Sequence, residues 1–377
     1  MLGSNHVLVT ENEGTIHGII REEDAGEVET FNGILCPGFV NAHCHLELSH
    51  MKGLITEKTG LVDFVEKVVN ERHFAEDEIV SAIQRAEDEM IGNGIVAVGD
   101  ICNNLLTLTQ KQQQRISYYN FIEASGWLPE VSQPRFERAL SIFNGFTSVT
   151  PPGTNSIVPH APYSVSAELW QRIMPWFINN AVSIHNQETC FEDELFIQGT
   201  GDLLRMYQLL KIDNAFHKPT RKSSLQSYYS HLSGAASIIL VHNTFTSQAD
   251  IEFAMRHKRG SQRLSFCLCV NANLYIENAL PPIELLRSQN CDIVLGTDSL
   301  ASNHALSILD EIKTIQRNFP MIPLPEILQW ATLNGAKALQ MEERIGSFDK
   351  GKKPGVILIR NAGGMVMNEE TAVQRII

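Results

Sequence analysis

Eight short apolar runs recur along this chain, and they restrict its possible folds more than any other feature of the sequence. They lie at residues 34–40, 95–100, 116–122, 155–159, 181–184, 237–241, 264–270 and 292–296. Most are separated by stretches with the 3.6-residue apolar period of a helix, such as 61–71, 76–91, 167–179, 248–257, 283–288 and 306–318. Buried strands that alternate with helices predict an α/β fold, here a (β/α)8 TIM barrel whose working face lies at the C-terminal strand ends.

Both ends of the chain have a different pattern. Short alternating segments, separated by Gly and acidic residues, are typical of small antiparallel strands. We therefore expect residues 1–36 and 345–377 to form one small β-sandwich domain and residues 37–344 to form the barrel. Residues 192–232 are longer than one helix requires, and we interpret them as an insertion that covers the substrate.

The composition disfavours several classes of partner. A formal net charge of −13 would repel phosphate backbones and anionic lipid, so we expect no nucleic-acid and no membrane binding. No apolar run is long enough to span a bilayer, and the first residues lack the basic start and apolar core of a signal peptide. Seven scattered cysteines indicate reduced thiols rather than a disulfide framework. We expect a cytoplasmic protein that acts on a small molecule.

Two histidines follow the first apolar run. His43 and His45 have the i, i+2 spacing that turns side chains to one face of a strand, whereas Cys44 faces away. Such a pair could hold a metal ion, or it could be two polar residues on a half-exposed strand. The metal hypothesis therefore needs further ligands elsewhere in the chain.

Four more strand ends carry suitable residues. His160 follows the fourth predicted strand, His185 and Glu188 the fifth, His242 the sixth and Asp298 the eighth. Structural residues would be scattered along the strands, but these share the end where a barrel places its chemistry. Their common position favours one site.

The residue types suit a catalytic divalent ion. His43, His45, His185 and Asp298 would supply nitrogen and oxygen ligands and leave one position for water. A metal lowers the pKa of water from about 15.7 towards 7 and so provides a nucleophile at neutral pH. We predict one Zn2+ ion, and Fe2+ is also compatible with these ligands.

Two further residues can move protons. Glu188 lies three residues beyond His185, so it can enter the cavity without binding the metal. A carboxyl group in that position can carry a proton from the attacking water to a ring nitrogen of the substrate. His242 can assist as an electrostatic or acid–base partner, together with Asp298.

The ordered motifs resemble the amidohydrolase superfamily, in its branch of mononuclear-metal deaminases and chlorohydrolases that act on N-heterocycles. The resemblance covers nearly the whole chain and is carried by segments 37–45, 185–188, 242, 296–303, 330–337 and 345–359. It implies metal binding by His43, His45, His185 and Asp298, and catalysis by Glu188 and His242. It also implies a barrel with a terminal sandwich, and a homodimer is common in the branch.

Several other residues lie near the strand ends. Binuclear relatives place a carboxylated lysine after the fourth strand, but this chain has His160 there, which favours a single metal. His160 is similar to the substrate-contacting histidine of adenosine-type deaminases. Glu47 and Glu66 could reach substrate hydroxyls, although capping or solvated roles are equally compatible. Glu123 could contact the substrate, but we favour a structural role because buried carboxylates are commonly paired.

The resemblance implies hydrolytic deamination of a 6-aminopurine nucleoside. The segment 43–50 looks most like the aminodeoxyfutalosine deaminase-type group, and adenosine derivatives such as methylthioadenosine and S-adenosylhomocysteine are the other candidates. Amide hydrolysis or dechlorination of an N-heterocycle is an alternative, because the fold and the metal do not fix the substrate. A non-catalytic barrel is disfavoured because every ligand position is filled.

Overall fold

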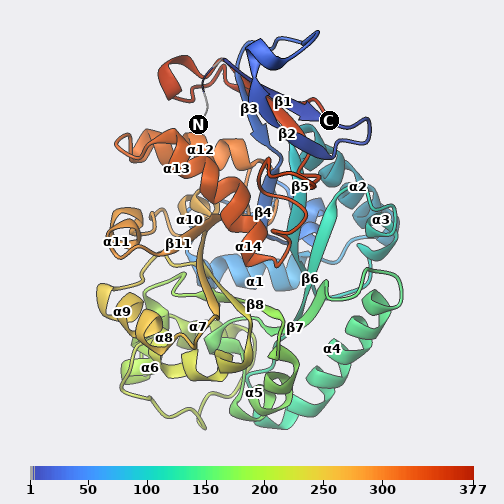
Figure 1. The fold of residues 1–377 in the computed structure, drawn as a ribbon. Coiled ribbons are helices and arrows are strands. Elements are labelled where there is room, and N and C mark those ends of the chain that lie inside the picture. The colour runs from blue at the N-terminus through green and yellow to red at the C-terminus, as the bar shows by residue number, and fades with distance from the viewer. Residues whose placement is uncertain (1–2, 4) are drawn as a thin grey trace.

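Eight parallel strands in chain order form the centre of the molecule (Figure 1). The computed structural model describes residues 3 and 5–377. The strands are β4 (Phe39–Cys44), β5 (Ile95–Cys102), β6 (Ser117–Ala124), β7 (Asn155–Pro159), β8 (Ala181–Asn186), β9 (Ser237–His242), β10 (Arg263–Leu268) and β11 (Asp292–Leu295). Nearly every residue in them is buried, which explains why they are continuous apolar runs rather than alternating ones.

Hydrogen bonds close these strands into a barrel. Strands β4 to β7 pair in order, as do β8 to β11. The two halves meet where the His185 amide donates to the His160 carbonyl oxygen at 3.0 Å. On the other side, the Thr297 amide donates to the His43 carbonyl oxygen at 3.0 Å, and Cys44 forms a parallel bridge with Asp298. The predicted (β/α)8 barrel is confirmed.

Helices cover the outside of the barrel (Figure 1). Those outside the β8–β9 connection are α1 (Leu61–Glu71), α2 (Glu76–Gly92), α3 (Leu108–Lys111), α4 (Ser132–Thr147), α5 (Ala167–Ile173), α9 (Gln248–His257), α10 (Val270–Ile276), α11 (Ile283–Ser288), α12 (Ile308–Asn318), α13 (Leu324–Gln329) and α14 (Gly335–Ala338). The six helices predicted from apolar periodicity are present, and α5 is shorter than expected because a 3-10 turn at Met174–Phe177 replaces its end.

The first predicted strand is in fact two strands. β3 (Ile34–Pro37) pairs with β12 (Val356–Arg360) in the terminal domain, and β4 begins the barrel at Phe39. Gly38 joins them in a place without room for a side chain, because an added Cβ atom would lie 2.9 Å from the Pro354 carbonyl oxygen. The prediction of one strand over 34–40 was wrong. Both β3 and β4 are apolar, and they are distinguished only by the strands with which they pair.

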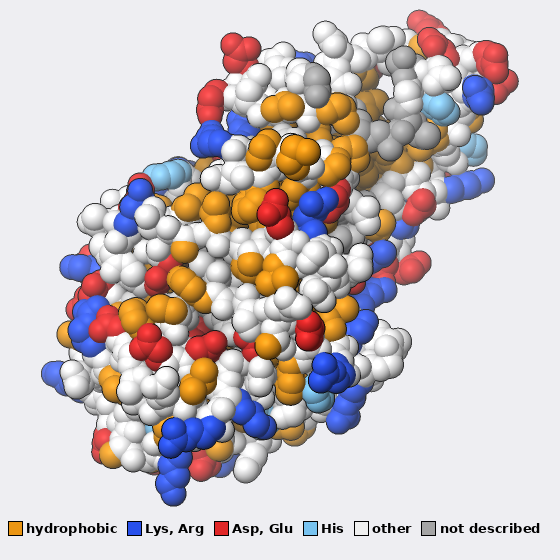
Figure 2. Space-filling view, turned by 90° about the vertical axis from the view of Figure 1, so that its left-hand side faces the viewer, with side chains coloured by type: hydrophobic (Ala, Val, Ile, Leu, Met, Phe, Trp, Pro, Cys, Tyr) orange, Lys and Arg blue, Asp and Glu red, His pale blue; other side chains and the backbone are white. Residues whose placement is uncertain are grey.

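Two small antiparallel sheets, built from both ends of the chain, form the terminal domain (Figure 1). One contains β1 (His6–Thr10) and β2 (Ile16–Arg21), and the other has the order β13-β12-β3, with β13 at Ala372–Arg375. Figure 2 shows hydrophobic side chains gathered between this domain and the barrel, whereas charged side chains are dispersed over the rest of that face. The expected β-domain built from both termini is therefore present.

The long connection between β8 and β9 contains α6 (Phe191–Gln198), α7 (Leu203–Leu209) and α8 (Ser224–Tyr228). Tyr207 of α7 stacks on Trp127 at a ring-centroid distance of 5.5 Å, and its hydroxyl donates to the Tyr163 carbonyl oxygen at 2.6 Å. Arg205 reaches α1, where its Nη1 lies 2.6 Å from Asp63 Oδ1. These contacts hold α7 against the loops at the C-terminal ends of the strands.

No helix among residues 3 and 5–377 is long and apolar enough to cross a membrane.

Gly99 of β5 provides a test of the barrel packing. A Cβ atom added there would lie 2.5 Å from the Ala42 carbonyl oxygen and 2.8 Å from Leu339 Cδ2. We expect Gly99→Ala to lower the free energy of unfolding by about 1–3 kcal/mol, the usual cost of overpacking. Gly18→Ala in β2 is the control, since nothing lies within 4 Å of its added Cβ. Urea denaturation measures both, and an equal loss in the two variants would contradict the packing argument.

Candidate metal centre and cavity

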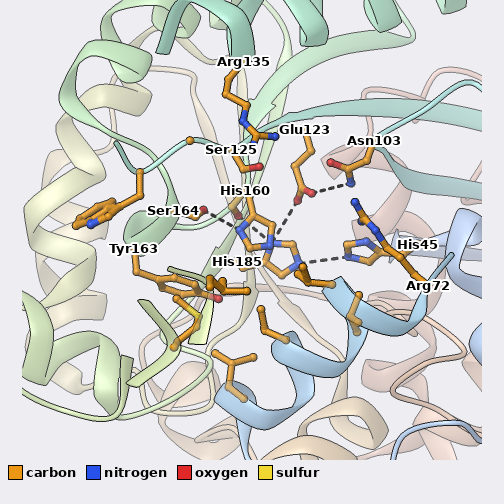
Figure 3. Close-up of a pocket in the computed structure, with 18 of the residues that line it drawn as sticks. His45, Arg72, Asn103, Glu123, Ser125, Arg135, His160, Tyr163, Ser164 and His185 are labelled. Carbon is orange, nitrogen blue, oxygen red and sulfur yellow. Dashed lines mark hydrogen bonds and ion pairs between the residues drawn. The ribbon is translucent and has the colours of Figure 1, made fainter. Parts of the chain in front are cut away.

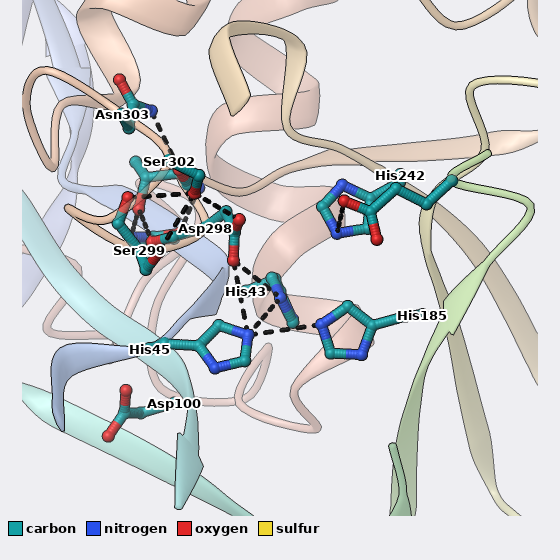
Figure 4. Close-up of polar contacts among 12 residues, drawn as sticks. His43, His45, Asp100, His185, His242, Asp298, Ser299, Ser302 and Asn303 are labelled. Atoms are coloured by element: carbon teal, nitrogen blue, oxygen red, sulfur yellow. Dashed lines mark hydrogen bonds and ion pairs between the residues drawn. The ribbon is translucent and has the colours of Figure 1, made fainter. Parts of the chain in front are cut away.

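The predicted site residues meet at the C-terminal end of the barrel (Figure 4). His43 lies in β4, His45 follows its last residue, His185 lies near the end of β8 and Asp298 follows β11. All four side chains are buried, and their ligand atoms lie within 4.8 Å of one another. The structure therefore brings the four expected ligands together from the first, fifth and eighth barrel strands.

The separations within this cluster fit one metal ion. His45 Nε2 lies 3.2 Å from His43 Nε2, 3.3 Å from His185 Nε2 and 3.3 Å from Asp298 Oδ1. Atoms that lie about 2.0–2.1 Å from one centre are about 2.9–3.6 Å apart at angles of about 90–120°, an arrangement that can leave a further position for water. Three imidazole nitrogens and one carboxylate oxygen are also the donors that a divalent transition metal prefers. The residues present thus fit a single divalent ion.

Hydrogen bonds outside the cluster orient its ligands. The His185 Nδ1–H donates to the His160 carbonyl oxygen at 2.8 Å, which leaves the Nε2 lone pair facing the cluster. Asp298 has a left-handed backbone with φ of 57°, and its Oδ2 accepts a hydrogen bond from the Ser302 hydroxyl. Burial would raise the pKa of Asp298, but the facing histidines outweigh it and hold the pKa well below its usual range. Asp298 is therefore ionised.

Glu188 and His242 lie beside the cluster as a facing pair. His242 Nε2 is 3.6 Å from Glu188 Oε1, and both side chains are buried. The His242 Nδ1–H donates to Asn273 Oδ1 at 2.8 Å, so its Nε2 lone pair points towards Glu188. Burial, followed by the charge of Asp298, raises the pKa of Glu188 well above its usual range. A carboxyl group kept protonated next to a metal site can donate a proton to a bound molecule.

A cavity of about 490 Å³ opens above the cluster (Figure 3). His45, His185, His242, Glu188 and Asp298 all lie on its wall. The rest of the wall is mainly apolar and includes the α1 side chains Leu61, Phe64, Val65 and Val68, with Trp127, Met206, Tyr207 and Leu210. Its volume and its apolar lining with a few convergent polar groups are typical of a small-molecule site.

Two predicted substrate contacts also lie on the wall. His160 Nδ1 is 2.8 Å from the Ser164 hydroxyl, and burial lowers the pKa of His160 to about 4, so its ring is neutral. Glu47 Oε2 accepts a hydrogen bond from the Asn103 amide at 2.9 Å. Burial raises the pKa of Glu47 to about 7. Both side chains can reach a molecule bound in the cavity.

Two other glutamates had alternative roles in the sequence analysis. Glu66 accepts a hydrogen bond from Asn70, one turn further along α1, and is not among the cavity residues, which favours its solvated role. Glu123, interpreted as structural, lies on the cavity wall with Oε1 3.6 Å from His185 Nδ1. Its Oε2 accepts a hydrogen bond from the Asn103 side chain at 2.9 Å. This placement favours the alternative of a substrate contact for Glu123.

Three arginines of the cavity were missed by the sequence interpretation. Arg72 follows α1, and Arg135 and Arg138 belong to α4; Figure 3 labels the first two. Arg138 Nη2 donates a hydrogen bond to the Asn103 carbonyl oxygen at 3.2 Å, whereas the guanidinium groups of Arg72 and Arg135 form no ion pair or hydrogen bond within the described part of the chain. Helix residues of this kind carry no local signal, because their direction depends on how each helix packs against the barrel. Asn273, which orients His242, was missed for the same reason.

Comparison with known proteins agrees with this geometry. The Amidohydrolase family matches residues 34–371. An adenosine deaminase from Helicobacter pylori is 25% identical over 328 residues, which cover 85% of this chain and 78% of that protein. Two similar folds are an aminofutalosine deaminase from Helicobacter pylori in complex with methylthio-coformycin (TM-score 0.81, 22% identity, 97% of this chain and 88% of that one) and an atrazine chlorohydrolase from Arthrobacter aurescens complexed with zinc (TM-score 0.69, 16% identity, 95% and 83%). The family match spans most of the chain, and the chain therefore belongs to the amidohydrolase family.

Proposed function

We propose that this protein is a metal-dependent hydrolase that removes ammonia from a 6-aminopurine nucleoside. The observation that carries the proposal is the buried carboxyl group of Glu188, which lies beside the His/Asp cluster without belonging to it. A carboxyl group of this kind can protonate a ring nitrogen while the carbon that bears the amine is attacked. The adenosine deaminase and aminofutalosine deaminase among its relatives support the same substrate class.

His43, His45, His185 and Asp298 would hold the metal, and we propose zinc because their donors and spacing suit it. When bound, the ion lowers the pKa of water and so makes hydroxide available at neutral pH. The zinc complex of the chlorohydrolase relative supports this assignment.

The protein side chains then carry the protons. Glu188 would donate a proton from its carboxyl group to the ring nitrogen next to the carbon that bears the amine. Attack of hydroxide on that carbon would end the aromaticity of the six-membered ring, and the electron pair of the broken carbon–nitrogen π bond would move to the protonated nitrogen. His242 Nε2 and the ionised carboxylate of Asp298 would accept the proton lost by the attacking water. The amine would then take up the proton held by His242 or Asp298 and leave as ammonia, while the new hydroxyl group would return a proton to Glu188 and become the carbonyl group of the product.

Ammonia release tests the reaction. The zinc-loaded protein should release ammonia from at least one member of a panel containing adenosine, 5′-deoxyadenosine, methylthioadenosine, S-adenosylhomocysteine and aminofutalosine. Guanine and atrazine, an oxopurine and a chlorinated triazine, are the comparison substrates. Protein with one metal ion per chain that released no ammonia from the whole panel would contradict the proposal.

Within the panel we favour aminofutalosine, whose sugar carries a carboxylated aromatic group. Arg72 and Arg135 place two unpaired positive charges on the wall of an otherwise mainly apolar cavity. In a protein of net charge −13, such guanidinium groups suit an anionic substituent of the substrate. Trp127 and Phe64 offer apolar surface for its ring. Adenosine and methylthioadenosine would leave both arginines unused.

Replacing the arginines separates these substrates. For Arg72→Met and Arg135→Met we expect KM for aminofutalosine to rise about 10- to 100-fold, because a hydrogen bond between charged groups contributes about 1.5–3 kcal/mol. KM for uncharged 5′-deoxyadenosine should change little. Arg256→Met, on the exposed surface of α9, is the control. Equal KM changes for both substrates would contradict the anion-binding role.

A further inference from the structure

The position of Glu188, in the short loop after β8, is not held by contacts of the Glu188 side chain. The loop turns sharply at Gln187, which has a φ of 44°, an unfavourable value for a residue with a side chain. Within the described residues, the Glu188 carboxyl group forms no hydrogen bond, and its polar neighbour is His242 Nε2 at 3.6 Å. The backbone of this loop therefore decides where the carboxyl group lies.

A second glutamate holds that backbone. Glu192, in the first turn of α6, is fully buried. Its Oε1 accepts a hydrogen bond from the Glu188 amide at 2.9 Å, and its Oε2 accepts one from the Gln187 amide at 3.0 Å. The Ser224 hydroxyl, in α8, lies 2.9 Å from the same Oε2. One carboxyl group thus fixes two consecutive amides of the loop and connects them to the long segment between β8 and β9.

This arrangement is costly for stability alone. Glu192 forms no ion pair with any lysine or arginine in the part of the chain that the structure describes. Burial raises the pKa of Glu192 to about 8, against the lowering effect of the hydrogen bonds from Glu188, Ser224 and Gln187. A buried carboxyl group without a cationic partner is destabilising unless its hydrogen bonds compensate, and those of Glu192 go to the loop that holds Glu188.

We propose that Glu192 is a positioning residue, which sets the place of the Glu188 carboxyl group through the amides of residues 187 and 188. The inference rests on the proposed role of Glu188 as proton donor. Glutamate is suited to this task because both of its oxygens can accept an amide proton. Glutamine has one acceptor oxygen, and its nitrogen is only a donor, so it would face one of the two amides with a second donor.

The test compares Glu192→Gln with Glu194→Gln, the same substitution on the same helix. Glu194 forms no hydrogen bond through its side chain in the described structure. We expect Glu192→Gln to lower kcat for deamination roughly 10- to 100-fold while KM and the zinc content stay within twofold of the unmodified protein, as is typical when a supporting residue is lost. Glu194→Gln should match the unmodified protein. A fall in zinc content, parallel changes in kcat and KM, or an unchanged kcat would overturn the proposal.

Two additional measurements cover other outcomes. If Glu192→Gln fails to fold, Ser224→Ala removes one hydrogen bond from the Glu192 carboxyl group and should lower kcat by a few-fold at unchanged KM, whereas no change would overturn the proposal. A crystal structure of the folded variant should show the contact between Glu188 Oε1 and His242 Nε2 lengthened. That readout needs no turnover, so it separates failure of this inference from failure of the deaminase assignment.

Discussion

Glu188→Gln is expected to lower kcat for ammonia release by about 10²- to 10⁴-fold, the usual contribution of a general acid or base. The glutamine side chain has nearly the same shape but no carboxyl proton to donate to the ring nitrogen. Zinc content should remain at one ion per chain, because Glu188 is not part of the four-atom cluster. Steady-state ammonia release and metal analysis of the same preparation measure the two quantities.

Glu168→Gln, on an exposed position of α5, is the matched control and should leave kcat unchanged. The outcome also distinguishes the two classes of chemistry that this fold supports. Amide hydrolysis or dechlorination does not require protonation of a ring nitrogen in the same way. Full turnover by Glu188→Gln would therefore contradict the deaminase assignment and favour the alternative hydrolases.

His185→Ala is expected to abolish metal retention and to lower kcat/KM by roughly 10³-fold or more, since a catalytic metal contributes several kcal/mol. The substitution removes one of four clustered donors and the side-chain hydrogen bond from Nδ1 to the His160 carbonyl oxygen. The metal content after gel filtration and the rate of ammonia release are the measurements. Dialysis against a chelator should have the same effect on the unmodified protein, and added zinc should restore its activity.

The chelated protein should also melt at a lower temperature, because a metal that binds only the folded state stabilises it. His17→Ala replaces an exposed histidine of β2 in the terminal domain, and it should alter neither metal content nor rate. Retention of zinc and full activity by His185→Ala would exclude His185 from the metal site.

The sequence predicted the barrel because each barrel strand is buried on both faces and is therefore a continuous apolar run. It did not predict α4, whose start contains Pro134 and whose end contains Gly145, two residue types that usually mark loops. The division of residues 34–40 into β3 and β4 was also missed. Both strands are apolar, so only their partners in space distinguish them.

For the site, the sequence correctly predicted which residues lie together wherever position along the chain determines position in space. Strand ends converge in any parallel barrel, and so the order of the strands alone is enough to bring His43, His45, His185 and Asp298 into one cluster. Arg72 and Asn273 lie on or next to helices, and their directions depend on packing. The role of Glu192 could not be predicted from the sequence either, because it depends on hydrogen bonds from two amides and not on the residue type.

The seam that closes the barrel has a consequence for the order of events during synthesis. Three of the clustered donors belong to the first half of the chain, but Asp298 follows the last barrel strand. The amide of Thr297, the residue before Asp298, donates a hydrogen bond to the His43 carbonyl oxygen. A ribosome-bound chain that ends before residue 298 can offer at most three donors to a metal. Under the proposed metal assignment, all four donors would be available only after the last strand has docked beside the first, so a fully bound metal ion would indicate a closed barrel.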